Sequence, residues 1–466
     1  MTARDLILRN VEVAGRTGLD VRLSGGRIAE VGARLAGPGE AFDGRGGALL
    51  PGLIDHHIHL LATAAQAQSL RLEGLAGPDA FEQAVRAAVA QLPPGGWLRA
   101  TGYHERIAGD LDRDALDRAA PDHRLRVQHQ TGSLWVLNSR ALEALTSDGV
   151  PSEAERDASG RLTGRIWRGD AWLRAQLAGD PPDLAPLGAQ LAAYGITGLT
   201  DASATTDAGA ARILAAAHRA GALPQRLTLM SAGPLAAPRD AAFAVGPVKV
   251  LLDDARLIAL DDFVARIEGA RPQRRAVAVH CVTAGELALT LAAFEIGGAR
   301  PGDRIEHGGV IPAEAIPTLK RLGLTVVTQS AFVFERGDRY LAEVELAEQE
   351  DLYRCASLLA AGVPVAGSSD APYAAPDPWA GMAAAIRRRT RAGRPIGEGE
   401  QIAPAEALGL YLGSAHDPGG PPRRVARGGA ADLCLLATPL AEALAEPDAG
   451  CVRATVIDGE LVFAAD

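Results

Sequence analysis

The pattern of apolar and polar positions differs between the ends of the chain and its middle. Residues from about Leu6 to Leu50 alternate apolar and polar positions between glycine-rich breaks, as in LILRNVEV and DVRLSGGRIAEVG. A period of two is typical of short antiparallel strands joined by tight turns. The same pattern returns in ADLCLLATPL and CVRATVIDGELVFAA near the other end. We therefore expect residues 1–50 and 420–466 to form one small β-sandwich that is discontinuous in sequence.

The middle of the chain alternates fully apolar runs with Ala- and Leu-rich helical stretches. Apolar strands separated by helices indicate a parallel sheet that helices cover on its outer face. We count eight such strands, which is the number that closes a (β/α)8 barrel. They lie at 48–59, 195–203, 226–232, 246–254, 276–283, 303–309, 324–330 and 363–372. The predicted fold class is α/β, with a TIM-like barrel over residues 51–419.

The gap between the first and second barrel strands is too long for a single crossover helix. Residues 62–186 contain strand candidates of their own, GWLRATGYHE and RLRVQHQTGSLWVL, together with helices and turns. A long segment with its own apolar pattern is more often a lid or substrate domain than a loop. We expect an insertion lobe after strand one, folded over the barrel mouth.

Composition and charge exclude several classes of partner. The 466 residues carry a modest net charge of −10, and no basic stripe suggests a nucleic-acid surface. The sequence has no run of about 18 uncharged apolar residues that could span a membrane, and its first residues lack the apolar core of a secretory signal. The four cysteines lie far apart, which favours a reducing compartment over a disulfide framework. We expect a cytoplasmic protein that acts on a small-molecule substrate, with neither nucleic acid nor membrane as a partner.

Six side chains that could bind metal lie at the carboxyl ends of five predicted barrel strands. Residues at these ends converge on one mouth of the barrel. Imidazole and carboxylate groups favour zinc and also serve other divalent metals. The candidates are His57, His59, Lys249, His280, His307 and Asp370. Taken singly, each histidine could be a core residue and Asp370 could cap a turn, but their joint placement favours a metal site.

Lys249 is unusual in this chain. Only two of the 47 basic residues are lysines, and Lys249 lies in the apolar run GPVKVLLDD. Buried lysine can lose its proton, whereas arginine cannot. A neutral amine can form a carbamate, and this anion could bridge two metal ions about 3.5–4 Å apart. One alternative is that Lys249 pairs with Asp253 or Asp254.

The set PGLIDHHIH, VKVLLDD, AVHCVT, RIEHGG and GSSDAP resembles the amidohydrolase superfamily. It is most similar to the branch, amidohydrolase family 3, that includes N-substituted formamide deformylase. The resemblance covers nearly the whole chain and implies that all six candidates are ligands of one or two divalent ions, most often Zn²⁺, with carboxylated Lys249 as the bridge. His57, His59 and Asp370 would hold the more buried ion, and His280 and His307 the second. The resemblance also suggests a homodimer.

The predicted activity is hydrolysis of a C–N bond, other than a peptide bond, in an amide-like small molecule. N-formyl, N-acyl and cyclic amides are the substrates that we consider. A metal-bound hydroxide would attack, with Asp370 as the general base. Two departures from the family pattern concern the pocket wall: CVTAGE follows His280, and Asp253–Asp254 replaces an Asp-Gly pair after Lys249. Both weaken the transfer of a deformylase substrate.

Three alternatives remain open from the sequence. A mononuclear, deaminase-like site would leave Lys249 unmodified, and an ester or lactone could be cleaved by the same groups. A catalytically inactive binding or regulatory protein is less favoured, because every ligand position is filled. Candidate substrate-binding groups carry much weaker signals, and for most of them a structural role is the simpler interpretation. They are Tyr103, His104, His129 and Gln329. Arg304 and Glu306 flank His307 and alternate with outward positions, which suggests an ion pair between the barrel and a helix.

Overall fold

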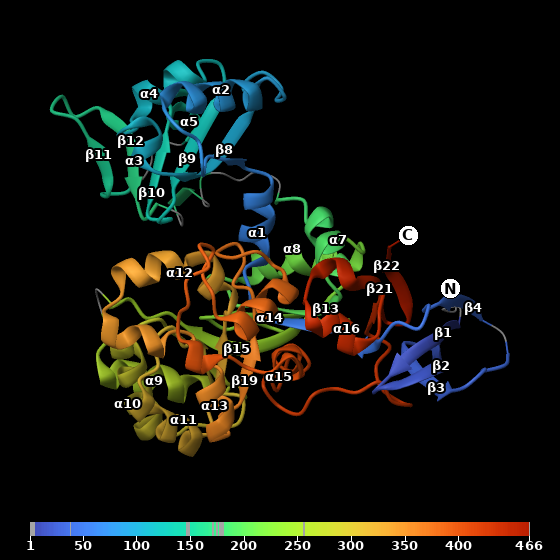
Figure 1. Cartoon of the computed structure of the whole chain (residues 1–466). Helices are drawn as coiled ribbons and strands as arrows, with labels where there is room; N and C mark the ends of the chain where they lie inside the picture. The colour runs from blue at the N-terminus through green and yellow to red at the C-terminus, as the bar shows by residue number, and fades with distance from the viewer. Residues whose placement is uncertain are drawn as a thin grey trace. The chain divides into compact units, whose positions relative to one another are not determined.

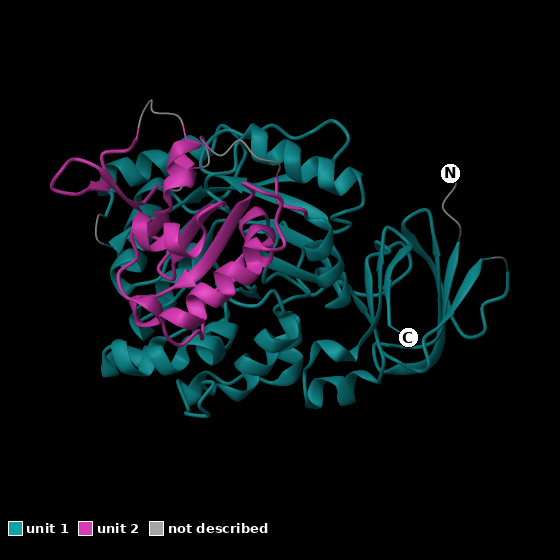
Figure 2. Ribbon diagram, turned by 90° about the horizontal axis from the view of Figure 1, so that it is seen from above, with its two compact units in different colours: residues 1–60, 184–466 teal, residues 61–183 magenta. Residues whose placement is uncertain are grey.

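The computed structural model describes residues 5–37, 39–145, 150–169, 172–173, 176, 181–254 and 257–465. The chain divides into two compact units, which Figure 2 distinguishes by colour. One unit comprises residues 1–60 and 184–466, and the other comprises residues 61–183. Among the described residues, none of the helices has both the length and the apolar character needed to cross a membrane.

The larger unit contains an eight-stranded sheet in which each pair of neighbouring strands is parallel, in the order β19-β18-β17-β16-β15-β14-β13-β6. The edge strands meet at one end, where the Asp370 amide donates to the His57 carbonyl over 2.8 Å and the His59 amide donates to the Ala371 carbonyl over 2.8 Å. The strands are β6 (Leu53–Ile58), β13 (Ile196–Asp201), β14 (Arg226–Ser231), β15 (Ala244–Val250), β16 (Val277–Cys281), β17 (Arg304–His307), β18 (Thr325–Thr328) and β19 (Val365–Gly367). The predicted α/β, TIM-like fold class is confirmed, and all eight predicted strands are present.

Helices follow the barrel strands, as the alternating sequence pattern predicts (Figure 1). Each buries one apolar face, and α9 does so with Phe263, Val264 and Ile267. The sequence CVTAGE begins α10, where the Thr283 side chain and Glu286 form a capping box. The helices of this unit are α7 (Ala185–Ala193), α8 (Ala208–Arg219), α9 (Leu260–Ala270), α10 (Ala284–Gly297), α11 (Ile316–Leu322), α12 (Ala331–Glu343), α13 (Ala356–Ala361), α14 (Pro378–Arg387), α15 (Pro404–Gly409) and α16 (Leu440–Ala445).

Both ends of the chain build a β-sandwich of two four-stranded sheets, as predicted for the fold class. One sheet has the order β3-β2-β1-β4 and the other the order β22-β21-β20-β5. Leu8 and Val21 from the first sheet share a hydrophobic core with Leu433 and Val456 from the second. The strands are β1 (Leu6–Val13), β2 (Arg16–Ser24), β3 (Arg27–Gly32), β4 (Glu40–Asp43), β5 (Leu49–Pro51), β20 (Leu433–Leu436), β21 (Val452–Ile457) and β22 (Glu460–Ala464).

The smaller unit is the predicted insertion lobe after strand one. Its six-stranded sheet has the order β11-β12-β10-β9-β8-β7, with β7, β8 and β9 mutually parallel and the remaining pairs antiparallel. Phe81 and Val85 of α2 pack against Leu125 and Val127 of β9 in its core. Its elements are β7 (Leu70–Arg71), α2 (Pro78–Val89), β8 (Trp97–Tyr103), α3 (Glu105–Ala108), α4 (Arg113–Ala119), β9 (Arg124–His129), β10 (Leu134–Leu137), α5 (Ser139–Glu143), β11 (Ala154–Arg156) and β12 (Leu162–Trp167). Helix α1 (Leu60–Ala67) lies at the junction of the two units.

Candidate metal centre

The barrel places the six predicted ligands at the carboxyl ends of its strands. His57 is the penultimate residue of β6, and His59 follows that strand directly. Lys249 and His280 are the penultimate residues of β15 and β16, and His307 ends β17. Asp370 stands in the segment that follows β19. Parallel strands bring residues that are far apart in sequence to one end of the barrel.

His57, His59 and Asp370 form a compact group. The His57 Nε2 atom lies 3.3 Å from Asp370 Oδ1, and the His59 Nε2 atom lies 3.2 Å from the same oxygen. One ligand atom from each of the three residues lies within 4.8 Å of the others. His57 and Asp370 are buried, and His59 is partly exposed. This is the trio that the sequence assigned to the more buried ion.

His280 and His307 lie beside this trio. Their ring centroids are 4.5 Å apart, and the His307 ring centroid is 4.8 Å from that of His57. The His307 Nδ1 atom lies 3.8 Å from Asp370 Oδ2. The structure therefore brings four histidines and one carboxylate into a single cluster from the ends of four strands, β6, β16, β17 and β19.

In three of these histidines, the Nδ1 atom contacts a polar side chain that is not one of the predicted ligands. The His59 Nδ1 atom lies 3.0 Å from a serine hydroxyl, and the His307 Nδ1 atom lies 2.8 Å from a glutamine amide oxygen. The pairs are His57 with Glu306, His59 with Ser203, and His307 with Gln329. A partner on one ring nitrogen fixes the tautomer and turns the other nitrogen toward a ligand. Gln329, which the sequence suggested as a substrate contact, bonds a candidate ligand, and its substrate-binding role stays a prediction.

Lys249 is almost completely buried and lies close to the histidines. Its Nζ atom is 4.0 Å from Glu306 Oε2 and has no hydrogen-bond partner among the described residues. Burial lowers the pKa of its ammonium group. The ion pair found for Lys249 is thus with Glu306, whereas Asp254 accepts a hydrogen bond from the Thr283 hydroxyl over 3.1 Å.

The electrostatics favour an ionised Asp370 and neutral His280 and His307. Burial and Lys249 lower the pKa of His57, but Glu306 and Asp370 outweigh them and raise it. Burial alone would raise the pKa of Asp370, but His307 and His57 hold it well below the ordinary value. Burial, assisted by the charge on Lys249, lowers the pKa of His280 to about 4. Burial also lowers the pKa of His307 well below its ordinary value. Neutral imidazole and charged carboxylate are the forms that bind divalent metals.

Two of the candidate ligands have left-handed backbone conformations. His307 has φ of 71° and Asp370 has φ of 54°, although neither is glycine. Such conformations cost of order 1–3 kcal/mol and cluster at functional sites. Hydrogen bonds hold the Asp370 segment in place: Asp55 accepts from the Ser369 amide over 3.0 Å and from the His57 amide over 3.1 Å. Asp55 thereby links the end of β6 to the segment that carries Asp370.

These residues fit a divalent metal ion. Buried polar atoms normally find hydrogen-bond partners, yet His57 Nε2 and Lys249 Nζ have none in the described parts of the chain. Both atoms belong to the cluster around Asp370. The donor set of imidazoles and carboxylate matches the ligands that zinc takes in proteins.

The three candidates in the insertion unit are bonded within that unit. The Tyr103 hydroxyl donates to the Gly109 carbonyl. His104 caps α3, and its Nδ1 atom accepts from the Arg106 amide over 3.1 Å. His129 contacts the Thr131 hydroxyl over 2.8 Å and Glu105 over 3.3 Å. These contacts account for all three side chains by local structure, and their substrate-binding roles stay predictions.

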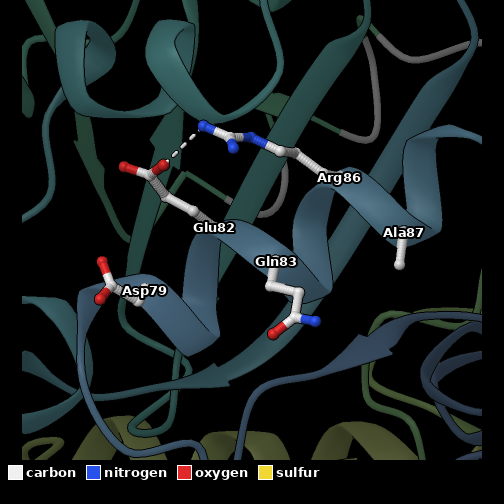
Figure 3. A pocket seen from close by; sticks show the side chains of 5 residues that line it. All are labelled: Asp79, Glu82, Gln83, Arg86 and Ala87. Carbon is white, nitrogen blue, oxygen red and sulfur yellow. Dashed lines mark hydrogen bonds and ion pairs between the residues drawn. The ribbon is translucent and has the colours of Figure 1, made fainter.

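A surface hollow of the insertion unit is formed by one helix (Figure 3). Its lining residues come from α2, and Arg86 pairs with Glu82 over 2.7 Å one turn earlier. The lining residues are Asp79, Glu82, Gln83, Arg86 and Ala87. None of these five is one of the predicted site residues, so the hollow adds nothing to the candidate metal centre.

Arg304 and Glu306 were interpreted wrongly from the sequence. Instead of joining the barrel to a helix, both are buried in the barrel: Arg304 Nε donates to Glu306 Oε1 over 2.5 Å, and Glu306 Oε2 contacts His57. The positive φ of His307 interrupts the period-2 alternation on which that interpretation depended. Two charged residues in a four-residue barrel strand, RIEH, were the signal that could have revealed them. Ser203 and Asp55 gave no comparable signal.

Comparison with known proteins identifies the family. The sequence model of the amidohydrolase family matches residues 40–463. The chain is 26% identical to N-substituted formamide deformylase of Arthrobacter pascens, an alignment that covers 89% of this chain and 90% of the relative. The resemblance predicted from the motifs is thereby confirmed.

Solved structures share the fold. An uncharacterised metal-dependent hydrolase from Pyrococcus furiosus superposes with a TM-score of 0.73 at 19% identity, over 92% of this chain and 98% of the other. A second, from Pyrococcus horikoshii OT3, has a TM-score of 0.72 at 19% identity, over 87% of this chain and 91% of the other. Because the sequence model of the family matches residues 40–463, the chain is a hydrolase of the amidohydrolase family.

Proposed function

We propose that this hydrolase is metal-dependent and cleaves a C–N bond, other than a peptide bond, in an amide-like small molecule. The observation that carries the proposal is the convergence of the buried His57 and Asp370 with the partly exposed His59, near the buried Lys249. Within this family, such a cluster supports a hydrolytic centre better than a binding site alone. N-formyl, N-acyl and cyclic amides are the substrate classes that we favour.

The proposed centre has two positions for metal, and zinc is the ion that suits both. His57, His59 and Asp370 would hold one ion, and His280 with His307 would hold the other. Lys249, carboxylated on its buried Nζ atom, would supply the bridging anion. When bound, such ions lower the pKa of water toward about 7 and polarise the scissile carbonyl.

Asp370 is the proposed general base. Its pKa lies well below the ordinary value because His307 and His57 outweigh the effect of burial, so the carboxylate is ionised. Asp370 would accept a proton from the attacking water and return it to the departing amine. The hydrogen bond from its amide to the His57 carbonyl, 2.8 Å long, helps to hold it in place.

The histidines would serve as neutral ligands. Gln329 holds the Nδ1 atom of His307 and Ser203 holds that of His59, so we assign Nε2 as the ligand atom of each ring. These contacts reduce the reorganisation needed when a ligand binds. The partly exposed His59 lies on the accessible side of the cluster.

A mononuclear centre is the second candidate. It is favoured by one observation: the compact group of three potential ligands contains His57, His59 and Asp370, without His280 or His307. In that case Lys249 would remain an amine paired with Glu306. Such a centre resembles the deaminase-like alternative, and ester or lactone hydrolysis would use the same groups.

Elemental analysis of the purified protein tests the proposal directly. We expect two equivalents of zinc or a similar metal, falling sharply in Lys249→Ala. The matched control is Lys320→Ala, which removes the other lysine, an exposed side chain at the end of α11. Asp370→Asn should also reduce the metal content.

The outcomes separate the alternatives. One equivalent that is indifferent to Lys249→Ala would favour the mononuclear centre. Absence of metal after growth in supplemented medium would overturn the metal-dependent proposal. With metal present, libraries of N-formyl, N-acyl and cyclic amides identify the substrate, with esters and lactones as comparators.

A further inference from the structure

We propose that Glu306 is a positioning residue that sets the tautomer of His57, so that the His57 Nε2 atom is free to bind metal. The inference extends the proposed metal centre and rests on it for its functional meaning. Glu306 would touch neither substrate nor metal. It would act through His57.

The contacts of Glu306 are divided between its two oxygens. Oε1 accepts a hydrogen bond from Arg304 Nε over 2.5 Å. Oε2 contacts His57 Nδ1 and lies 4.0 Å from Lys249 Nζ. All four side chains are at least 98% buried. Water is therefore not available to replace any of these contacts.

Charge makes this carboxylate an acceptor. Its Oε1 atom accepts from the guanidinium group of Arg304, whose permanent positive charge favours the ionised carboxylate. An ionised carboxylate can only accept hydrogen bonds. The His57 Nδ1 atom must therefore carry the proton of this contact, which leaves the lone pair of a neutral His57 on Nε2. That atom lies 3.3 Å from Asp370 Oδ1.

Arg304 determines which oxygen of Glu306 faces His57. Its Nε atom donates to Oε1, and its terminal nitrogen donates to the His56 carbonyl over 3.0 Å. The guanidinium group thus links Glu306 to β6, the strand that carries His57. In Glu306→Gln, the amide oxygen would stay on Arg304, because the arginine can only donate.

The amide group of Glu306→Gln would consequently point at His57. It would donate to Nδ1, and the proton of a neutral His57 would move to Nε2. That proton would occupy the nitrogen needed for metal. The substitution keeps the size of the side chain and changes the direction of one hydrogen bond, so its effect on the metal is distinct from a loss of packing.

A second buried glutamate provides a matched control. Glu400 accepts from Arg354 over 2.6 Å and from the Cys355 amide over 2.9 Å. It is 4% exposed and pairs with arginine, as Glu306 does. Its hydrogen-bond partners are Arg354 and the amides of Cys355 and Ser357, with no histidine among them in the described parts of the chain. Glu400→Gln therefore removes a buried charge without changing a candidate ligand.

The experiment compares the wild type, Glu306→Gln and Glu400→Gln in two measurements. The first is Zn²⁺ affinity by competition with a chromogenic chelator. We expect a 10–100-fold weaker affinity in Glu306→Gln, the range found when groups that orient metal ligands are removed. Glu400→Gln should match the wild type. Equal affinity in Glu306→Gln and the wild type would overturn the proposal.

The second measurement is the 15N spectrum of histidine-labelled, metal-free protein, with the His57 signals assigned from a His57→Ala variant. In the pH range where His57 is neutral, we expect the proton on Nδ1 in the wild type and on Nε2 in Glu306→Gln. The same tautomer in both proteins would overturn the role of Glu306. A wild type that binds no Zn²⁺ would defeat the proposed function, while this spectrum would still test the tautomer.

Glu306→Asp covers the case in which Glu306→Gln does not fold. The aspartate keeps the charge that balances Arg304 but is one methylene shorter, so the contact with His57 lengthens. We expect several-fold weaker Zn²⁺ affinity with the fold preserved. A folded Glu306→Asp protein with wild-type affinity would count against the positioning role.

Discussion

The barrel and the insertion unit each contain a cluster of histidines and carboxylates. The two clusters differ in how far hydrogen bonds to neighbouring residues satisfy the polar atoms of their members. In the insertion unit, His104 and His129 lie with ring centroids 5.7 Å apart beside Glu105. The His104 ring caps α3 by accepting from the Arg106 amide, and the His129 ring contacts the hydroxyl of Thr131, two residues further along the chain. In the barrel, His57 and Asp370 come from strands at opposite ends of the sheet order. There the His57 Nε2 atom is buried and has no hydrogen-bond partner among the described residues.

This difference separates two kinds of polar cluster. A cluster of neighbouring residues that satisfy one another is explained by folding alone. The barrel cluster joins strands that are far apart in sequence. It has two positive φ angles and a buried nitrogen without a hydrogen-bond partner in the described parts of the chain, and folding does not explain these costs. We therefore place function in the barrel cluster, and the predictions below test that distinction.

The largest effect is expected for Asp370→Asn. The amide cannot accept a proton as a base, so kcat should fall by roughly 10²–10⁴-fold on the substrate that the library screen identifies. The assay includes excess Zn²⁺. The control is Asp377→Asn, because Asp377 caps α14 by accepting from the Trp379 amide. Retention of more than a tenth of the activity in Asp370→Asn would contradict the assignment of function to the barrel cluster.

Metal removal should destabilise the barrel and leave the insertion unit unchanged. A ligand held at 100 times its Kd stabilises the folded state by about 2.7 kcal/mol. After chelation, hydrogen exchange followed by mass spectrometry should show faster exchange in β6, β16 and β17. Peptides from β8, β9 and β10 serve as the internal control. Equally faster hydrogen exchange in both units would contradict the assignment of metal binding to the barrel cluster.

Tyr103→Phe should affect stability and leave catalysis unchanged. It removes the hydroxyl that donates to the Gly109 carbonyl, and a hydrogen bond of this kind contributes about 1 kcal/mol. Urea unfolding measures the free-energy difference, and kcat should remain within about twofold of the wild type. A large rise in KM at unchanged stability would instead make Tyr103 a substrate contact.

The smallest effect is expected for His129→Gln. The pair with Glu105 is partly exposed, and such pairs contribute about 0–1 kcal/mol. Glutamine preserves the polarity and much of the length of the side chain. We expect near-wild-type stability and kcat/KM, measured alongside Tyr103→Phe. A hundredfold loss of kcat/KM would overturn the contrast, because the insertion cluster would then take part in the reaction.

The sequence was sufficient for the fold because its periodicities are strong. The eight apolar runs are strands whose side chains are buried on both faces, and β6, β13, β17 and β18 are buried at every position. The six candidate ligands could be placed at strand ends for the same reason, since parallel strands end at one mouth. Neither inference requires knowledge of side-chain packing.

The contacts that hold the ligands could not be predicted in this way. The role of Glu306 depends on the left-handed backbone of His307, which changes the direction of successive side chains within one residue. Ser203 meets His59 only because β13 pairs with β6 in a particular register. Such contacts depend on register and local φ, and hydrophobic periodicity reports neither.

The split β-sandwich has a consequence for how the chain folds as it is synthesised. Strand β5 pairs with β20, so Leu50 lies opposite Cys434 across nearly the whole length of the chain. At roughly 5–20 residues per second, β5 would wait about 20–80 s after leaving the ribosome before its partner is made. During that interval β1 and β2 can form their hairpin, but the apolar face of that sheet has no partner sheet. We expect nascent chains stalled before β20 to bind holdase chaperones through this face and to release them once β20 and β21 have emerged.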